Sequence, residues 1–218
     1  MNCIILLKNK KRSKSIMKQK EVLGENEIKL LIDNAGSADL QLIIYLMCRT
    51  GMRVGELINF KIKWINFEDL TIKIQENKAP IPWTPKRDSK RLLGISEALA
   101  AHLKRHIQNR KKGYVFQSHK KHNNRGRSFG RYNYSSIIKK VNEISIKVLN
   151  RNIGTHIFRA TFASNLLANG MDLEKLRKLL GHSDIKTTLI YCRSIPDSRS
   201  FEKLRDPKFL KNIEYQEI

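Results

Sequence analysis

The spacing of apolar residues changes twice along the chain, and these changes limit the folds that the sequence can adopt. Residues before 60 and after 96 carry apolar side chains at helical spacing. Between them, KIKWINFEDLTIKIQ at 61–75 alternates apolar and polar residues, which predicts strands, and KRLLGIS at 90–96 predicts a returning strand. The sequence therefore predicts an α+β fold, mainly helical, with a small antiparallel sheet and a long, proline-rich turn.

The expected helices have local start and stop signals. Gly51, Gly113 and Gly181 follow helical patterns and are expected to end them. Asp172 precedes LEKLRKLL and is a candidate N-cap. We predict helices over the residue ranges 25–36, 38–51, 53–60, 96–113, 134–150, 155–170, 172–181 and 183–192.

The chain has 43 Lys and Arg against 20 Asp and Glu, a formal net charge of +23. Such a surplus favours a polyanionic partner, and phosphate neutralisation with counterion release makes nucleic acid the first candidate. An anionic membrane surface and a merely soluble basic protein are the alternatives. No run of 18 apolar residues predicts a membrane span, and the N-terminus does not resemble a secretory signal. The three cysteines form no CxxC pair and are typical of the reducing cytoplasm.

Basic residues are concentrated between Ala98 and Asn142, where twelve Lys and Arg occur without an acid. Few aromatic residues are interspersed, which favours contacts with duplex phosphates over stacking on single-stranded bases. A solvated helix face is the alternative. His102 and His106 lie four apart, but no acid or cysteine lies nearby in the sequence to complete a metal site. The candidate DNA-binding residues are Lys104, Arg105, Arg110, Lys111, Lys112, Lys120, Lys121, Arg125, Arg127 and Arg131.

Three motifs in separate parts of the chain carry arginine, histidine and tyrosine residues at defined spacings. TGMRVGEL contains Arg53, THIFRATFASNLLANG contains His156 and Arg159, and KLLGHSDIKTTLIY contains His182 and Tyr191. In this order and with these gaps, the motifs resemble the tyrosine recombinase (phage-type integrase) family, over residues 21–192. The resemblance implies an enzyme that cleaves and rejoins duplex DNA without a metal or other cofactor, through a 3′-phosphotyrosine intermediate.

The resemblance also implies a role for each motif residue. Tyr191 would attack phosphorus, and His156 would take the phenol proton, because an ordinary histidine has a pKa of about 6.5 and is largely unprotonated near neutral pH. Arg53 and Arg159 would hold the non-bridging oxygens with forked hydrogen bonds. His182 would donate a hydrogen bond to the same phosphate. The biological setting would be the integration, excision or resolution of a mobile element or replicon.

The leaving 5′-oxygen needs a proton, which the family takes from a lysine in the turn between two strands. Lys86 matches this position best, because Arg91 follows it by five residues on the returning strand. Lys90 and Lys78 remain alternatives. Glu56 follows Arg53 by three residues and is expected to orient that arginine or to contribute to packing.

We expect a basic N-terminal arm at 1–20, a catalytic domain at 21–195 and a charged C-terminal tail at 196–218. Family members commonly have a separate DNA-clamping domain before the catalytic domain. Here we expect that the clamp has been lost, that the chain is a fragment, or that another polypeptide supplies it, and the basic arm could substitute for it in part. The resemblance implies a homotetramer on DNA. Tail residues could contact a neighbouring protomer or dock on their own chain: Phe201, Leu204, Phe209 and Leu210.

Two other functions fit the same residues. A relaxase resembling type IB topoisomerases would use closely similar chemistry. A non-catalytic DNA-binding accessory or remnant of a full-length recombinase would keep the charge and lose the reaction.

Overall fold

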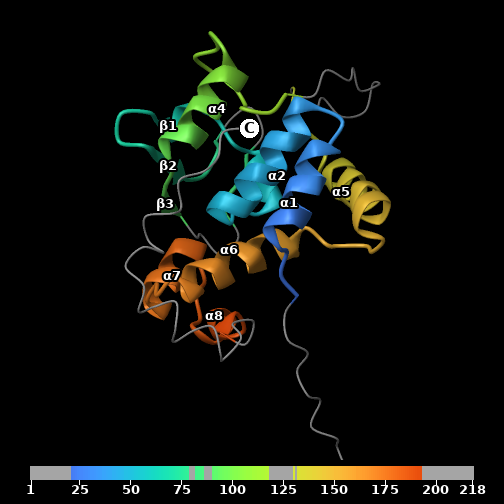
Figure 1. The fold of residues 1–218 in the computed structure, drawn as a ribbon. Coiled ribbons are helices and arrows are strands. Elements are labelled where there is room, and N and C mark those ends of the chain that lie inside the picture. Colours follow the sequence, from blue (N-terminus) through green and yellow to red (C-terminus); the bar gives the residue numbers. More distant parts are fainter. Residues whose placement is uncertain (1–20, 79–81, 86–89, 118–129, 131, 193–218) are drawn as a thin grey trace, which may run out of the picture.

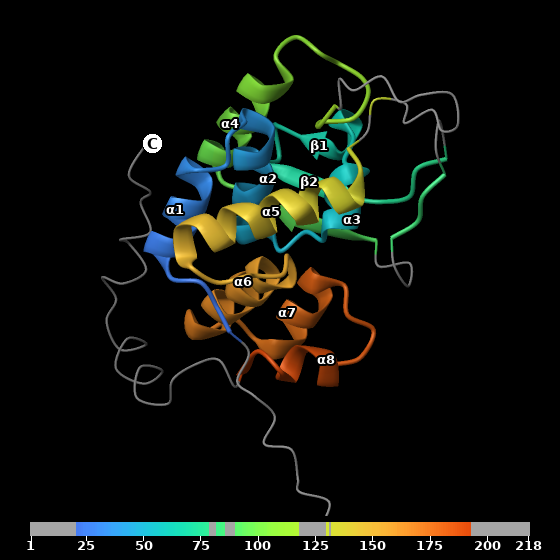
Figure 2. The same ribbon diagram turned by 90° about the vertical axis from the view of Figure 1, so that its right-hand side faces the viewer.

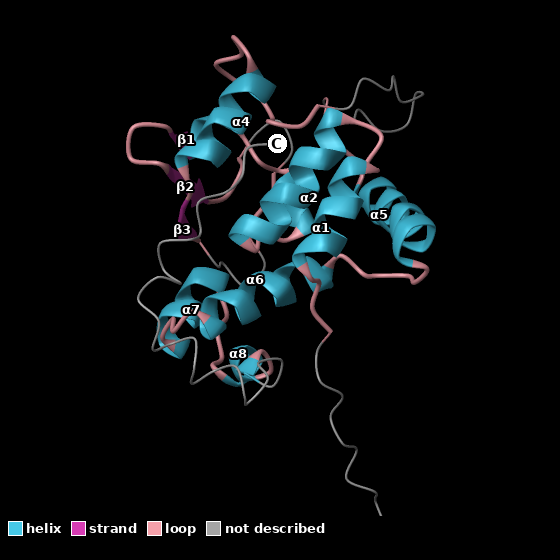
Figure 3. Ribbon diagram, in the orientation of Figure 1, coloured by secondary structure: helices cyan, strands magenta, loops and turns pink. Residues whose placement is uncertain are grey.

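The computed structural model describes residues 21–78, 82–85, 90–117, 130 and 132–192. Most described residues with regular structure are helical, and a small sheet lies at one side of the molecule (Figures 1 and 3). This arrangement confirms the predicted α+β fold. The helices are α1 (Glu25–Asp33), α2 (Ala38–Thr50), α3 (Val54–Ile58), α4 (Glu97–Ile107), α5 (Tyr134–Leu149), α6 (His156–Ala168), α7 (Leu173–Leu180), α8 (Lys186–Leu189) and one 3₁₀ turn (Ile62–Trp64).

The sheet has three antiparallel strands, β1 (Ile65–Asn66), β2 (Thr71–Ile74) and β3 (Arg91–Gly94), in the order β1-β2-β3. Strand β2 pairs along its whole length with β3. The alternating pattern at 61–75 therefore predicted strands correctly only in part. Residues 62–64 form the 3₁₀ turn, because the buried Trp64 packs among aromatic rings below the sheet edge instead of extending it.

The helices form two tiers around two hydrophobic cores. Helices α1 to α5 and the sheet enclose the larger one, the main core, which includes Leu46, Phe60 and Phe158. Helices α6, α7 and α8 form the lower tier in both views (Figures 1 and 2). They enclose the C-terminal core, whose buried residues are Ala160, Ala163, Leu176, Leu180 and Tyr191. Helix α6 contributes to both cores and so joins the two tiers.

Three of the predicted helix ends are confirmed. Gly51 and Gly181 adopt the left-handed conformation after α2 and α7, with φ of 62° and 65°. The Asp172 carboxylate accepts hydrogen bonds from the backbone N–H groups of Glu174 and Lys175 at the start of α7. These signals are local, so the sequence alone was enough to locate them.

The predicted end of α4 at Gly113 was wrong, because the helix ends at Ile107. Gln108 takes a positive φ of 51° and reverses the chain. Beyond it, the Gly113 carbonyl accepts from Ile62 and the Val115 N–H donates to Phe60. This pairing with a distant segment holds residues 113–115 extended, which a helix running to Gly113 would prevent.

The predicted arm at 1–20 and the tail residues at 196–218 lie outside the described residues. Within the described ranges, no helix combines the length and the hydropathy that a bilayer crossing requires.

Candidate active site

Arg53 stands at the start of α3, directly after the turn that ends α2. Its backbone N–H donates to Glu56 Oε2 at 2.8 Å, as a glutamate at the third helical position commonly does. Its guanidinium Nη1 donates to Glu56 Oε1 at 3.0 Å. The Arg53 side chain is 23% exposed and Glu56 is almost completely buried. Glu56 therefore orients Arg53, as expected, and the guanidinium still reaches solvent.

The same carboxylate binds a second arginine from the sheet. Arg91, the first residue of β3, donates from Nη1 and Nη2 to the two Glu56 oxygens at 2.8 Å each. Burial by itself would raise the pKa of the Glu56 carboxyl. The hydrogen bonds and charge of Arg91, with those of Arg53, outweigh burial and bring that pKa below its ordinary value. Glu56 is therefore ionised near neutral pH and ties α3 to the sheet.

Arg159 lies on α6, between the ends of two other helices. Its Nη1 donates to the carbonyl of Gly51 at 2.6 Å, and its Nη2 donates to the carbonyl of Leu180. The residue is only 5% exposed. Burial first, and then the nearby charges of Arg53 and Arg91, lower the pKa of Arg159 to about 9, so it stays cationic at neutral pH.

His182 and Tyr191 lie beside Arg159. The His182 Nε2 is 3.3 Å from Arg159 Nη2, and its Nδ1 is 2.9 Å from Thr188 Oγ1. The imidazole and the Tyr191 ring stack with centroids 6.1 Å apart and planes inclined by 19°. Tyr191 is 4% exposed and its backbone N–H donates to the Thr188 carbonyl at 3.0 Å. Three of the predicted site residues, Arg159, His182 and Tyr191, are therefore linked by successive contacts.

His156 opens α6, one turn before Arg159, and is exposed. Lys86, the best-matching general acid in the sequence, lies outside the described residues. Lys90 directly precedes Arg91 at the start of β3, and Lys78 directly follows Asn77, whose backbone pairs with that of Trp83. Both alternatives therefore flank, in the sequence, the segment that contains Lys86.

The sequence analysis did not single out Thr188. It is completely buried, and it contacts His182 through its hydroxyl and Tyr191 through its carbonyl. Thr188 lies six residues after His182 and three before Tyr191, and this spacing was the signal in the sequence that could have identified it. From the sequence alone, Thr188 could not be distinguished from its neighbour Thr187 as the residue that contacts His182.

The basic segment is described in part. Lys104 places its ammonium 5.3 Å from the centre of the Phe67 ring. Arg110 donates to the carbonyls of Tyr114 and Val115 at 2.8 and 2.9 Å, so its guanidinium holds the segment after α4. Three others are exposed: Arg105, Lys111 and Lys112. The remaining candidates lie outside the described residues: Lys120, Lys121, Arg125, Arg127 and Arg131.

The histidine pair on α4 has partners in the fold. His106 Nε2 lies 3.3 Å from Asp39 Oδ1, and His102 meets the Tyr45 ring edge-on. An acid thus reaches His106 from α2, which the sequence neighbourhood did not indicate. In the described part of the chain, no group of three or more His, Cys, Asp or Glu side chains is arranged to hold a metal ion.

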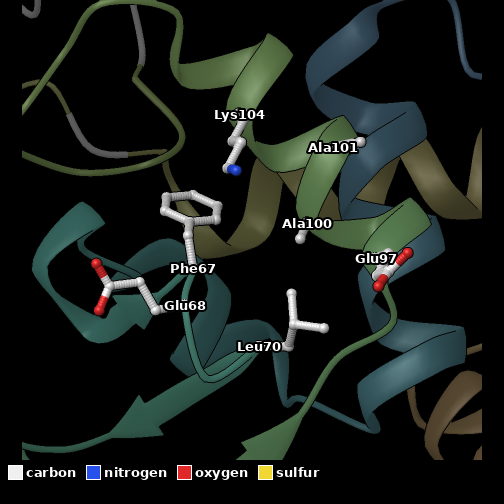
Figure 4. A pocket seen from close by; sticks show the side chains of 7 residues that line it. All are labelled: Phe67, Glu68, Leu70, Glu97, Ala100, Ala101 and Lys104. Carbon is white, nitrogen blue, oxygen red and sulfur yellow. The ribbon is translucent and has the colours of Figure 1, made fainter.

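A pocket of about 370 Å³ lies between α4 and the turn after β1 (Figure 4). Its lining mixes an apolar floor with charged side chains at the edge. None of the candidate catalytic residues is among those that line it: Phe67, Glu68, Leu70, Glu97, Ala100, Ala101 and Lys104. The candidate site is therefore a separate feature, placed where the two tiers meet.

The chemistry of the site follows from its charges. Arg53 and Arg91 bind the Glu56 carboxylate, and Arg159 lies near enough for the charges of all three to affect its pKa, so these four groups together carry a net charge of +2. Such a surplus attracts an anion, and forked guanidiniums match the oxygens of a phosphate. A phenol and an imidazole lie at the same place. The arrangement is therefore suited to binding a phosphate next to an oxygen nucleophile.

Comparison with known proteins places these features in a family. The sequence profile of the phage integrase family matches residues 21–197. The tyrosine recombinase XerA of Pyrococcus horikoshii is 30% identical over 207 residues, which cover 95% of this chain and 67% of the relative. The tyrosine recombinase XerD of Staphylococcus epidermidis is 27% identical over 188 residues, which cover 84% of this chain and 59% of the relative. The chain thus spans about three fifths to two thirds of the length of these curated relatives.

Solved structures agree with the sequence comparison. The crystal structure of a XerA recombinase superposes with a TM-score of 0.64 at 25% identity, covering 89% of this chain and 65% of that one. The Tn1549 transposon integrase, solved in complex with a circular intermediate DNA, superposes with a TM-score of 0.63 at 20% identity, which concerns the fold alone. The motifs, the fold and the profile match agree, and the chain belongs to the phage integrase family of tyrosine recombinases.

Proposed function

We propose that this chain cleaves and rejoins DNA strands at specific sites, with Tyr191 as the nucleophile. The phenol oxygen attacks the scissile phosphorus, the bond to the 5′-oxygen breaks, and the strand end stays attached as a 3′-phosphotyrosine. A 5′-hydroxyl from the same or another strand then reverses the step. The phosphodiester free energy is kept in the covalent bond, so no nucleotide triphosphate is consumed.

The observation that carries this proposal is the contact chain from Arg159 through His182 to Tyr191. It brings a guanidinium, an imidazole and a phenol together, although His182 and Tyr191 lie 23 and 32 residues after Arg159 in the sequence. Arg53 joins them closely enough to lower the pKa of Arg159. We assign Arg53 and Arg159 to the non-bridging oxygens, because these oxygens gather negative charge in the transition state.

The proton transfers need two further groups. His156, exposed at the start of the helix that carries Arg159, is proposed to accept the phenol proton. Lys86 is proposed to donate a proton to the leaving 5′-oxygen, with Lys90 and Lys78 as the alternatives. These assignments follow from the resemblance of the motifs and from the chemistry that each step requires.

We further propose duplex DNA as the substrate and a tetramer on DNA as the active assembly. The net charge of +23 and the exposed Arg105, Lys111 and Lys112 support a DNA-facing basic surface. The proposed division of the chain remains 1–20 as a basic arm, 21–195 as the catalytic domain and 196–218 as a tail. A separate DNA-clamping domain or a partner protein would add further contacts with DNA.

The experiment uses nicked duplexes that tile the DNA on both sides of the gene. A nick beside the cleavage point releases a short fragment and traps the covalent intermediate. We expect a denaturation-resistant protein–DNA adduct with the wild type and with Tyr134→Phe, an exposed tyrosine on α5 that serves as the matched control. We expect no adduct with Tyr191→Phe.

Other outcomes point to other functions. Salt-sensitive binding of these duplexes without any adduct would favour the non-catalytic accessory. Adduct formation with relaxation of supercoils on plasmids that lack paired sites would favour the topoisomerase-like relaxase. An adduct that persists in Tyr191→Phe would place the nucleophile elsewhere.

A further inference from the structure

His182 is contacted at both of its ring nitrogens. Arg159 Nη2 lies 3.3 Å from Nε2, and Thr188 Oγ1 lies 2.9 Å from Nδ1. The two contacts come from opposite sides of the ring, one from α6 and one from α8. These two contacts therefore fix the orientation of the imidazole.

The partners also determine which nitrogen carries the proton. A guanidinium N–H only donates, so Nε2 must present its lone pair to Arg159. In a neutral imidazole the proton then resides on Nδ1, which donates to the Thr188 hydroxyl oxygen. A hydroxyl can accept this bond, whereas the valine that would have the same shape cannot.

We propose that Thr188 is a positioning residue that sets the tautomer of His182, and that binding of the scissile phosphate is coupled to uptake of one proton at His182 Nε2. The inference rests on the proposed strand-cleavage function. Non-bridging phosphate oxygens only accept hydrogen bonds, so an Nε2 that carries a lone pair cannot bind them. One proton from solvent converts His182 to an imidazolium that donates from Nδ1 to Thr188 and from Nε2 to the phosphate, and the proton returns to solvent when DNA leaves.

The charges around the ring make this uptake depend on the phosphate. Arg159 from α6 faces Nε2, and Arg177 from α7 donates to the His182 carbonyl at 2.7 Å. Tyr191 stacks on the ring, and Asp184 lies two residues along the chain. Arg177 is paired with the Glu174 carboxylate at 2.6 and 2.7 Å, so the Arg159 guanidinium is the charge that opposes a positive imidazole. A bound phosphate supplies the negative charge that compensates it.

Thr188 is also placed to act on the nucleophile. It is completely buried, and its carbonyl accepts the backbone N–H of Tyr191 at 3.0 Å. One residue therefore holds the imidazole through its side chain and the tyrosine through its backbone. A substitution that keeps the backbone and removes only the hydroxyl separates these two roles.

The first test needs no DNA and no activity. Long-range ¹H–¹⁵N NMR spectra of histidine-labelled protein distinguish the two neutral tautomers, and the His182 signals are assigned by their loss in His182→Gln. We expect His182 of the wild type, and of the control Thr187→Val, to carry its proton on Nδ1. Thr187 is the exposed neighbour of Thr188 on the same helix. An Nε2–H tautomer in the wild type would overturn the proposal.

The second test measures the consequence of removing the hydroxyl. We expect Thr188→Val to form adduct about 10- to 100-fold more slowly, as when the partner that orients a metal-binding histidine is removed. Thr188→Ser, which keeps the hydroxyl, should recover most of the wild-type rate and the Nδ1–H signal. Equal rates for Thr188→Val and wild type would contradict the positioning role, whatever the outcome of the NMR test.

The third test counts protons. Titration calorimetry of the nicked duplex in buffers of different ionisation enthalpy reports proton uptake, and Tyr191→Phe is used so that no cleavage occurs. We expect Tyr191→Phe to take up close to one proton more than Tyr191→Phe/His182→Gln at a pH where free His182 is neutral. Equal uptake would refute the coupling. Absence of adduct in the wild type would instead refute the proposed function, and the NMR result would still stand.

Discussion

The main core and the C-terminal core differ in what they bury. The main core is lined by large side chains from α1 to α5, the sheet and the start of α6, many of them completely buried. The C-terminal core has five buried residues, and one of them is Tyr191, the candidate nucleophile. Arg53 and Glu56 at α3, and Arg91 on β3, belong to the elements that enclose the main core. The candidate phosphate-binding residue Arg53 therefore lies beside the more extensive packing, and the candidate nucleophile Tyr191 lies in the smaller core.

Arg159 connects the two cores. It donates to the carbonyl of Gly51 at the end of α2 and to that of Leu180 at the end of α7. A residue proposed to bind the phosphate thus also joins the tiers that carry the other site residues. We expect α7 and α8 to open locally before the rest of the molecule unfolds, because the C-terminal core buries few side chains, whereas α6 also packs into the main core.

The largest expected effect comes from Glu56→Gln in the main core. The substitution leaves the buried guanidinium of Arg91 without its counter-charge, so we expect the free energy of unfolding to fall by about 3–5 kcal/mol. Denaturant unfolding measures this, with the exposed Glu68→Gln as the matched control. Equal stability of the two variants would mean that Glu56 is not needed to hold the main core together.

Ionisation of the Glu56 carboxylate should make the free energy of unfolding depend on pH. The folded-state pKa of Glu56 lies below its ordinary value of 4.5, so its contribution is complete above that value and is lost as pH falls through the folded-state pKa. Because a protonated glutamate resembles glutamine, the stability difference between wild type and Glu56→Gln should shrink as the solution is acidified below that range. Unfolding curves at several acidic pH values check this, and a constant difference would argue against an ionised Glu56.

Leu180→Ala tests whether the cores are separate. Leu180 is completely buried in the C-terminal core, and we expect a loss of about 2–5 kcal/mol. The loss should appear in hydrogen exchange of the amides of α7 and less in those of α2. Leu46→Ala in the main core is the control and should affect both helices. If Leu180→Ala lowers protection of α2 as much as that of α7, the two tiers unfold as one unit.

Gly51→Ala tests the junction between the tiers. A Cβ at Gly51 would lie 2.5 Å from Phe162 Cδ1, at a φ of 62°. We expect a loss of about 1–2 kcal/mol from the backbone conformation and roughly 1–3 kcal/mol more from the contact. Gly36→Ala is the control, because it has a φ of 69° and nothing within 4 Å. Thermal unfolding of the two variants separates the contact from the backbone effect.

The smallest expected effect concerns helix capping. Asp172→Ala removes the acceptor of two backbone N–H groups at the start of α7 and should cost about 1 kcal/mol. Ser37→Ala removes one bond of 3.3 Å at the start of α2 and should cost less. Hydrogen exchange should assign the first loss to the C-terminal tier and the second to the main core. The reverse assignment would contradict the proposed division.

Much of the site could be predicted from the sequence because its chemistry depends on residue types at local spacings. Arg53 with Glu56 three residues later, and His156 with Arg159, lie within single helical turns. The strand position of Arg91 also followed from its pattern. The length of α4 did not, because pairing of residues 113–115 with Phe60 and Ile62 ends the regular helix, and such pairing leaves no local signal.

By itself, the sequence determined the class of fold, the helix ends at Gly51 and Gly181, the cap at Asp172 and the identity of the candidate catalytic residues. The tertiary structure was needed to show that Glu56 binds two arginines, that Arg159 joins the ends of α2 and α7, and that the Thr188 hydroxyl contacts His182. The physical reason is that caps and turns depend on neighbours a few residues away. Buried hydrogen bonds depend on which distant segments the packing brings within about 3 Å of each other.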